Sequence, residues 1–280
     1  MFCMFFKSNK LLTLLKRLQM PGYAQLIMGP AGSGKSTYCS NMVKHMEVLR
    51  RNAYVINLDP AAEECNYPLL ADIKDLISLQ DVMEDDEMNL GPNGGLVFCL
   101  DDLLQSEDDV YIIIDLPGQI ELYTHMKFAQ KLTDMLRSLD FKICALFLLD
   151  AQFIIDPPKF IAGMLVALSV LVNVEVPHIS IMSKMDLLNS EQKQIVESYL
   201  EPDLFTLQDQ AEQCGSALNE RYQNLNKNLV QVLNDYSLVR FIPLDPNDED
   251  SFNHLLSCID MATQFYDDRE YRENPDIPFD

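Results

Sequence analysis

The stretch Gly29-Pro30-Ala31-Gly32-Ser33-Gly34-Lys35-Ser36-Thr37 decides which fold this sequence predicts. It fits the pattern G-x-x-x-x-G-K-[ST], whose glycines let backbone N–H groups turn toward an anion. An apolar run at 24–28 precedes it, and a helical pattern follows with these apolar residues on one face: Met42, Val43, Met46 and Leu49. A strand, such a loop and a helix in this order bind phosphate, because the positive end of the helix points at the same place. The alternative interpretation is a glycine-rich turn with an accidental lysine.

Lys35 and Ser36 have predicted roles within this loop. Lys35 is expected to reach the β- and γ-phosphates of a nucleotide, and the Ser36 hydroxyl to complete the shell of Mg²⁺. Beyond the loop, apolar runs that read as strands recur at 53–58, 110–114, 143–149, 179–182 and 239–244. Nearly continuous apolar runs are typical of parallel strands buried on both faces. The sequence therefore predicts an α/β fold of the P-loop NTPase class, with a mostly parallel sheet flanked by helices.

Carboxylates follow two of these strands. Asp59 closes the run at 53–58, and Asp115 closes the run at 110–114. Because open α/β sheets bind ligands at the carboxyl ends of their strands, Asp59 is expected to hold metal-bound or attacking water. The alternative is a turn-forming Asp before Pro60. Asp115 has the position of the second metal-coordinating carboxylate of P-loop enzymes, so Ser36 and Asp115 are the predicted Mg²⁺ ligands.

The turn after Asp115 and the end of the run at 179–182 supply the remaining groups. Gly118 can offer its N–H to a γ-phosphate, and Gln119 has a short amide suited to orienting a water molecule. Ser183-Lys184-Met185-Asp186 is a variant of the guanine-reading element N-K-x-D. A carboxylate there accepts two hydrogen bonds from guanine that adenine cannot donate, which gives selectivity for GTP. Serine in place of asparagine at 183 is expected to remove one contact to the base.

Composition and charge exclude several classes of protein. The 280-residue chain has a net charge of −22, which argues against a groove that tracks nucleic-acid phosphates. Its seven cysteines are scattered and never form C-x-x-C, so reduced thiols in a cytosolic or nuclear protein are expected. None of the four histidines lies near a cysteine at metal-ligand spacing, so no zinc site is predicted. The apolar run Ile161–Val172 is too short to span a bilayer and predicts a buried core helix.

The chain divides into three parts. Residues 1–19 carry four positive charges and no acid among apolar residues, which suits either a dispensable upstream extension or an amphipathic targeting helix. Residues 20–266 form the predicted nucleotide-binding domain, with a short helical stretch at Ile73–Leu79, a helical insertion at about 187–237 and a last helix at 252–265. Residues 267–280 form an acidic tail. Inside the domain, Gly91-Pro92-Asn93-Gly94-Gly95 presents Asn93 on a shaped loop, although its residues alone indicate only a turn.

The order of these motifs resembles the GPN-loop GTPases and, within them, the third eukaryotic paralogue. The resemblance covers Met20 to about Tyr266 and is carried by Asn57–Glu63, Gly91–Cys99 and Pro117–His125. It implies a dimeric GTPase with GTP and Mg²⁺ as cofactors, in which the Gly91-Pro92-Asn93 loop enters the partner's site and Asn93 stabilises phosphate. It implies that metal and attacking water are positioned by Asp59, Asp115, Gln119 and Glu121. The residues it implies for holding GTP are Gly32, Ser33, Gly34, Lys35, Ser36, Thr37, Ser183, Lys184, Met185 and Asp186. The phosphate-loop pattern adds Gly29 to the predicted nucleotide-binding residues, and the turn after Asp115 adds Gly118.

The resemblance also implies partners and location. Proteins of this family act in assembly and nuclear import of RNA polymerase II, usually as a heterodimer with the first paralogue. The resemblance therefore leads us to expect a cytoplasmic protein that shuttles to the nucleus. Neither membrane binding nor direct nucleic-acid binding is expected. One departure is the short segment between Cys99 and Asp115, where the family has a longer helix. Divergence and an incompletely spliced chain both explain it. It motivates an alternative function, an assembly adaptor with structural nucleotide and little turnover. A kinase that phosphorylates a small acceptor shares the phosphate loop, but no basic clamps for an acceptor are evident.

Overall fold

A computed structural model describes residues 22–59, 67, 69–72, 111–124, 128–138, 140–152, 155–198, 228–229, 231–233 and 239–266. Their strands form one sheet of seven in the order β3-β2-β4-β1-β5-β6-β7, and every neighbouring pair is parallel. The strands are β1 (Gly22–Met28), β2 (Ala53–Asn57), β3 (Leu69–Asp72), β4 (Tyr111–Asp115), β5 (Phe141–Asp150), β6 (His178–Ser183) and β7 (Phe241–Pro243). The parallel sheet confirms the predicted fold class.

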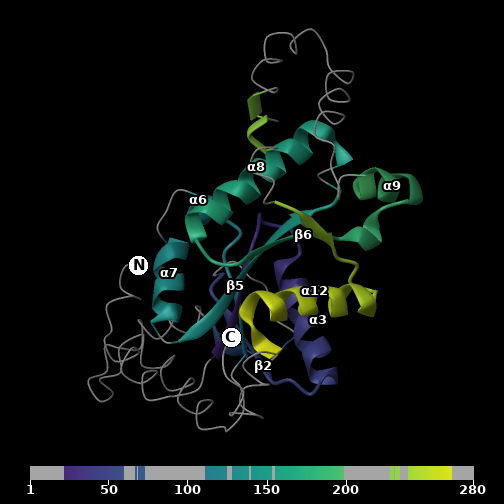
Figure 1. The fold of residues 1–280 in the computed structure, drawn as a ribbon. Coiled ribbons are helices and arrows are strands. Elements are labelled where there is room, and N and C mark those ends of the chain that lie inside the picture. The colour runs from purple at the N-terminus through teal and green to yellow at the C-terminus, as the bar shows by residue number, and fades with distance from the viewer. Residues whose placement is uncertain are drawn as a thin grey trace, which may run out of the picture.

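Helices cover both faces of the sheet (Figure 1). On one face lie α3 (Lys35–Val48) and α12 (Glu249–Thr263), which pack with β1, β4 and β5 around Tyr38, Met42 and Phe252. On the other face lie α6 (Glu121–Thr124), α7 (Phe128–Arg137) and α8 (Pro157–Val174), packed around Phe147 and Phe160. The short helix η2 (Met185–Leu187) and α9 (Ser190–Ser198) follow β6. Burial on both faces explains why the central strands are continuous apolar runs.

The register brings the strand ends that carry polar residues to one edge of the sheet. Ile27 pairs with Asp115, Asn57 also pairs with Asp115, and Asp150 pairs with Ser183. The backbone continues this alignment past the strands, because Leu116 N–H donates to Ile27 O at 3.1 Å and Leu58 N–H donates to Asp115 O at 2.8 Å. The phosphate loop and the motifs after β2, β4, β5 and β6 therefore meet at the carboxyl edge.

Several predicted elements differ in detail from the structure. The helical pattern predicts Leu49 on one face with Met42, Val43 and Met46, but α3 ends at Val48; Leu49 is its C-cap and is 44% exposed, whereas the other three are buried. The last helix begins at Glu249, earlier than predicted, because the Asp248 side chain caps it by accepting from Asp250 N–H. The prediction of a buried core helix at Ile161–Val172 holds for one face of α8 only, because Ile161, Met164, Ala167 and Val170 are buried while Val172 is 59% exposed. The strand β3 lies in a segment from which no strand was predicted.

Three further predictions concern parts of the chain outside the described residues. These are the extension at 1–19, the helix at Ile73–Leu79 and the tail at 267–280. The insertion predicted at about 187–237 is described only at its start, through α9, and at 228–229 and 231–233. No helix in the described part of the chain combines the length and apolar character that crossing a membrane requires.

Candidate nucleotide-binding site

The phosphate loop connects β1 to α3 and needs its glycines. Gly29, Gly32 and Gly34 have φ of +146°, +77° and +88°, values that favour glycine. A Cβ on Gly29 would lie 2.4 Å from the carbonyl oxygen of Leu148, so β5 also excludes a side chain there. Gly34 caps the N-terminus of α3, so the first N–H groups of the helix open toward the loop. The loop has the backbone shape that phosphate binding requires.

Lys35 lies over its own loop. Its Nζ donates to the carbonyl oxygens of Gly29 and Pro30, both at 3.2 Å. Burial lowers the pKa of this amine, and the carboxylates of Asp115 and Asp59 partly oppose that effect. The amine therefore sits between the loop carbonyls and two acidic side chains, where it can meet a phosphate.

Ser36 and Asp115 form the centre of the site. The Ser36 hydroxyl donates to Asp115 Oδ2 at 2.9 Å. Asp115 is fully buried, and burial raises the pKa of its carboxyl to about 6, against the effects of the Ser36 hydrogen bond and of Lys35. Its other oxygen, Oδ1, is buried and has no hydrogen-bond partner among the described residues. An orphaned carboxylate oxygen beside a hydroxyl suits Mg²⁺, which prefers oxygen ligands.

Asn57 positions Asp59, and sequence reasoning assigned it no role of its own. Asn57 is fully buried at the end of β2. Its Oδ1 accepts from Asp59 N–H at 2.9 Å, and its Nδ2 donates to Asp59 O at 3.3 Å and to Asp72 Oδ1 at 3.1 Å. The feature of the sequence that could have indicated this role is a polar amide at the end of an otherwise apolar strand, two residues before Asp59. These bonds hold Asp59 near the loop and anchor β3 through Asp72.

The turn after Asp115 packs directly on the phosphate loop. A Cβ on Gly118 would lie 2.8 Å from Ala31 Cα and 2.9 Å from Ala31 N, so only glycine fits without a shift. The Tyr123 hydroxyl donates to Pro117 O and pins the turn from the side of α6. Gln119 and Glu121 follow in this segment with exposed side chains, and within the described residues no hydrogen bond joins either of them to the loop. Gln119 and Glu121 are therefore close to the site in sequence, but no described hydrogen bond of their side chains fixes them in it.

Ser183 connects the guanine-reading element to the phosphate loop. Its hydroxyl lies 2.6 Å from the carbonyl oxygen of Ser33 and 3.2 Å from that of Leu149, and it can donate to either. Lys184 has φ of +61°, and its Nζ forms an ion pair with Asp150 Oδ2 at 2.8 Å. Met185 is buried in the core. Asp186, in η2, is exposed, so its carboxylate is accessible to a base.

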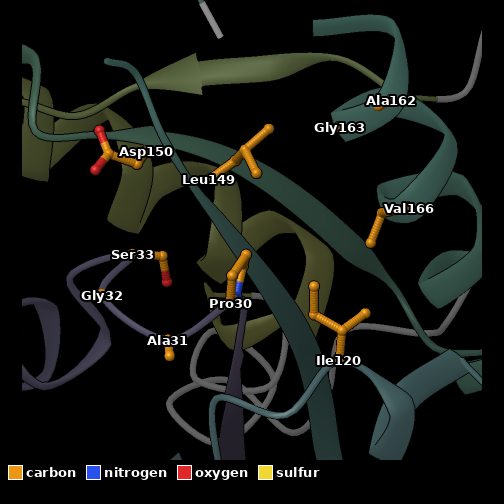
Figure 2. A pocket seen from close by; sticks show the side chains of 10 residues that line it. All are labelled: Pro30, Ala31, Gly32, Ser33, Ile120, Leu149, Asp150, Ala162, Gly163 and Val166. Atoms are coloured by element: carbon orange, nitrogen blue, oxygen red, sulfur yellow. The ribbon is translucent and has the colours of Figure 1, made fainter. Parts of the chain in front are cut away.

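A cavity of about 390 Å³ borders the phosphate loop on the side of α8. Figure 2 shows its walls: the loop at Pro30, Ala31, Gly32 and Ser33, the end of β5, Ile120, and α8 at Ala162, Gly163 and Val166. Asp150 is the one acidic residue in the lining, and it is paired with Lys184. The loop is thus reachable from this side. The predicted loop Gly91-Pro92-Asn93 lies outside the described residues.

Comparisons with known proteins identify the family of this chain. A family described as "conserved hypothetical ATP binding protein" matches residues 27–265. A GPN-loop GTPase 3 of Mycosarcoma maydis is 48% identical over 92% of this chain and 97% of its own length. Those of Xenopus tropicalis and Danio rerio are 47% and 44% identical, over 91% and 92% of this chain and 92% and 93% of theirs.

Among solved structures, the fold is similar to that of an apo-form GTPase from Pyrococcus abyssi. The TM-score is 0.63, with 23% sequence identity over 87% of this chain and 98% of that one. At this identity the likeness supports the fold alone, whereas the curated relatives cover nearly the whole chain at higher identity. The chain belongs to the GPN-loop GTPases, enzymes that hydrolyse GTP, and is similar to their GPN-loop GTPase 3 members.

Proposed function

We propose that this GTPase binds GTP together with Mg²⁺ at the carboxyl edge of the sheet and works as a dimeric switch. The observation that carries the Mg²⁺ part is the bond from Ser36 to Asp115, together with the orphaned Oδ1 of Asp115. Ser36 and Asp115 would hold the ion, directly or through water, and bound Mg²⁺ neutralises charge on the phosphate oxygens. Lys35 supplies a second positive charge from within the loop.

Guanine selectivity is assigned to Asp186. Its exposed carboxylate can accept from the N1–H and the exocyclic amine of guanine, whereas adenine has no such donor pair. The stem of Lys184 can lie against the purine. Ser183 acts on the loop rather than on the base, because its hydroxyl contacts Ser33 O and Leu149 O.

Hydrolysis requires an attacking water in line with the γ-phosphate. Asp59, held by Asn57, Gln119 and Glu121 are the candidates to orient that water. The side chains of Gln119 and Glu121 are exposed, so they have room to close over bound GTP. Asn93 of the Gly91-Pro92-Asn93 loop would complete the site by stabilising phosphate in the partner subunit.

The biological role follows from family resemblance. We propose a heterodimer with the first paralogue, or a homodimer, that acts in assembly and nuclear import of RNA polymerase II. The protein would work in the cytoplasm and shuttle to the nucleus, and the nucleotide state would change a client-binding surface.

The test is GTP hydrolysis by residues 20–280, alone and mixed with a first-paralogue partner. Hydrolysis that rises with the partner and falls with Asn93→Ala supports a shared site. Asp186→Asn should reduce the preference for GTP over its competitors ATP and XTP. Unchanged selectivity for GTP in this variant would defeat the assignment of guanine recognition to Asp186. Asp134→Asn, at an exposed acidic residue of α7, is the matched control for loss of one surface charge.

An assembly adaptor with little turnover remains the second candidate. The observations that favour it are the short segment between Cys99 and Asp115 and the serine at 183, which replaces the guanine-contacting asparagine and whose hydroxyl contacts Ser33 O of the phosphate loop. This candidate predicts tight GTP binding without hydrolysis in either mixture. A Gln119→Ala variant that loses both hydrolysis and biological function would count against it.

A further inference from the structure

A buried polar network joins the three elements that converge on the phosphate site. Gln25 lies on β1, Tyr38 on α3 and Tyr111 on β4. The Tyr38 hydroxyl donates to Gln25 Oε1 at 2.8 Å, and Gln25 Nε2 donates to the Tyr111 hydroxyl at 2.7 Å. All three side chains are at most 2% exposed. Since an apolar sheet face could pack without polar atoms, this network calls for an explanation beyond burial.

Each member sits close in sequence to one part of the site. Gln25 is four residues before Gly29, Tyr38 is two residues after Ser36, and Tyr111 is four residues before Asp115. Gln25 is therefore the link between the strand that leads into the loop, the helix that carries Ser36 and the strand that ends in Asp115. Among the described residues, no side chain of the three is hydrogen-bonded to the phosphate loop; the Tyr38 backbone N–H donates to Gly34 O at 2.9 Å as part of the first turn of α3.

The network is held by packing on both sides. The ring of Tyr38 stacks on Phe252 of α12 at a centroid distance of 6.4 Å, and the ring of Tyr111 stacks on Tyr23 at 6.1 Å. Burial raises the pKa of both hydroxyls, so each keeps its proton. Apolar packing is non-directional and fixes the position of α3 along the sheet less precisely than these hydrogen bonds, which weaken steeply when their atoms move apart by about 1 Å.

We propose that Tyr38, Gln25 and Tyr111 are positioning residues that set the register of α3 against β1 and β4, and through it the separation of Ser36 from Asp115. This inference rests on the proposed role of those two residues in holding Mg²⁺. A helix that slides would move the Ser36 hydroxyl away from Asp115 Oδ2, at present 2.9 Å apart. Disrupting the network should therefore lower the nucleotide affinity measured with Mg²⁺ more than the nucleotide affinity measured without it.

The test compares the affinity for a fluorescent GDP analogue with Mg²⁺ and with EDTA, in the full chain. In the wild type Mg²⁺ should tighten binding. Tyr38→Phe should reduce that tightening by about tenfold, the scale on which loss of a group that orients a metal ligand lowers metal affinity. Binding in EDTA should change by less than about twofold, because the loop itself is untouched.

Two further variants separate positioning from stability. Tyr38→Phe leaves Gln25 Oε1 buried without a donor, so its melting temperature should fall. The triple variant Gln25→Met/Tyr38→Phe/Tyr111→Phe removes all the polar atoms together and should recover melting temperature while the Mg²⁺ effect stays reduced. Leu132→Ala, which leaves a cavity under α7 on the other face of the sheet, is the control that should lower stability and keep the Mg²⁺ effect.

The outcomes are distinguishable. If Mg²⁺ does not tighten binding in the wild type, the Mg²⁺ site of the proposed function is wrong, and this inference falls with it. If the wild type responds to Mg²⁺ and Tyr38→Phe responds equally, the inference alone is overturned. Recovery of the full Mg²⁺ effect in the triple variant would also overturn it, because shape would then suffice without hydrogen bonds.

Discussion

Gly118→Ala tests whether the turn after β4 must touch the phosphate loop. Alanine keeps the N–H group at 118, and the φ of Gly118 lies outside the left-handed region, so the backbone tolerates the change. The added Cβ would lie 2.8 Å from Ala31 Cα and 2.9 Å from Ala31 N. Both contacts are to backbone atoms, which cannot turn aside as a side chain can.

The size of the effect follows from these distances. Carbon atoms pack comfortably at about 3.5 Å, so the turn and the loop must separate by roughly 0.7 Å. Overpacking of this kind costs about 1–3 kcal/mol of unfolding free energy. A shift near 1 Å in a catalytic group costs on the order of 100-fold in rate, so hydrolysis should fall about 10- to 100-fold.

The assays are urea denaturation, nucleotide binding and single-turnover GTP hydrolysis with partner present. Nucleotide affinity should change less than the rate, because the loop keeps its own geometry. The double variant Ala31→Gly/Gly118→Ala should not recover activity, since the clash is with Ala31 Cα and N rather than with its Cβ at 3.1 Å. A wild-type rate and stability in Gly118→Ala would refute the need for close contact between this turn and the phosphate loop. Rescue by Ala31→Gly would show that the clash is with the Ala31 side chain and not with its backbone.

Three further changes have defined outcomes. Burial lowers the pKa of His178 to about 4 from its ordinary value of 6.5, so between these pH values the unfolded chain binds more protons than the folded protein. The stabilising effect of a neutral His178 should be complete above pH 6.5, and the free energy of unfolding should fall by at most about 3 kcal/mol toward pH 4. In urea titrations at several pH values, His178→Gln should flatten this dependence. Arg51→Met removes the cation paired with the carboxylate of Asp260, which is 1% exposed and accepts from Arg51 at 2.9 and 3.0 Å. The change should cost about 3–5 kcal/mol in urea denaturation, most of it recovered in Arg51→Met/Asp260→Leu. Ser183→Ala removes the donor to Ser33 O and Leu149 O and should weaken GTP and GDP binding alike by about fivefold in titration, because a buried hydrogen bond contributes roughly 1 kcal/mol; a loss confined to GTP would contradict a role on the loop.

The sequence predicts the centre of the site well because its signals are local. The spacing from Gly29 to Ser36 demands a turn that only glycines allow, and positive φ at three of them confirms it. Asp115 is predictable because a continuous apolar strand ends there, and a carboxyl end at the sheet edge meets the loop. These inferences need no knowledge of which strands are neighbours.

The features that the sequence could not predict depend on which strands pair, in which register, and on where strands and helices end. That Ser183 contacts Ser33 follows from the register of β5 with β6, which no local pattern encodes. The strand β3 is four residues long and half-buried, too short for a periodic signal. Leu49 fits the helical period and still faces solvent, because α3 ends one residue earlier and Arg50 turns the chain with φ of +57°.

The position of β1 in the sheet has a consequence for synthesis of the chain. The strand that leads into the phosphate loop lies between β4 and β5, so it waits for partners that are translated much later. The 122 positions from Met28 to Asp150 take about 6–24 s at roughly 5–20 residues per second. Until Asp115 completes β4, 87 positions after Met28 or about 4–17 s at the same rate, the segment 22–28 has neither neighbour, and until β5 is made it has only one. An unpaired apolar strand of this kind favours aggregation before folding is complete.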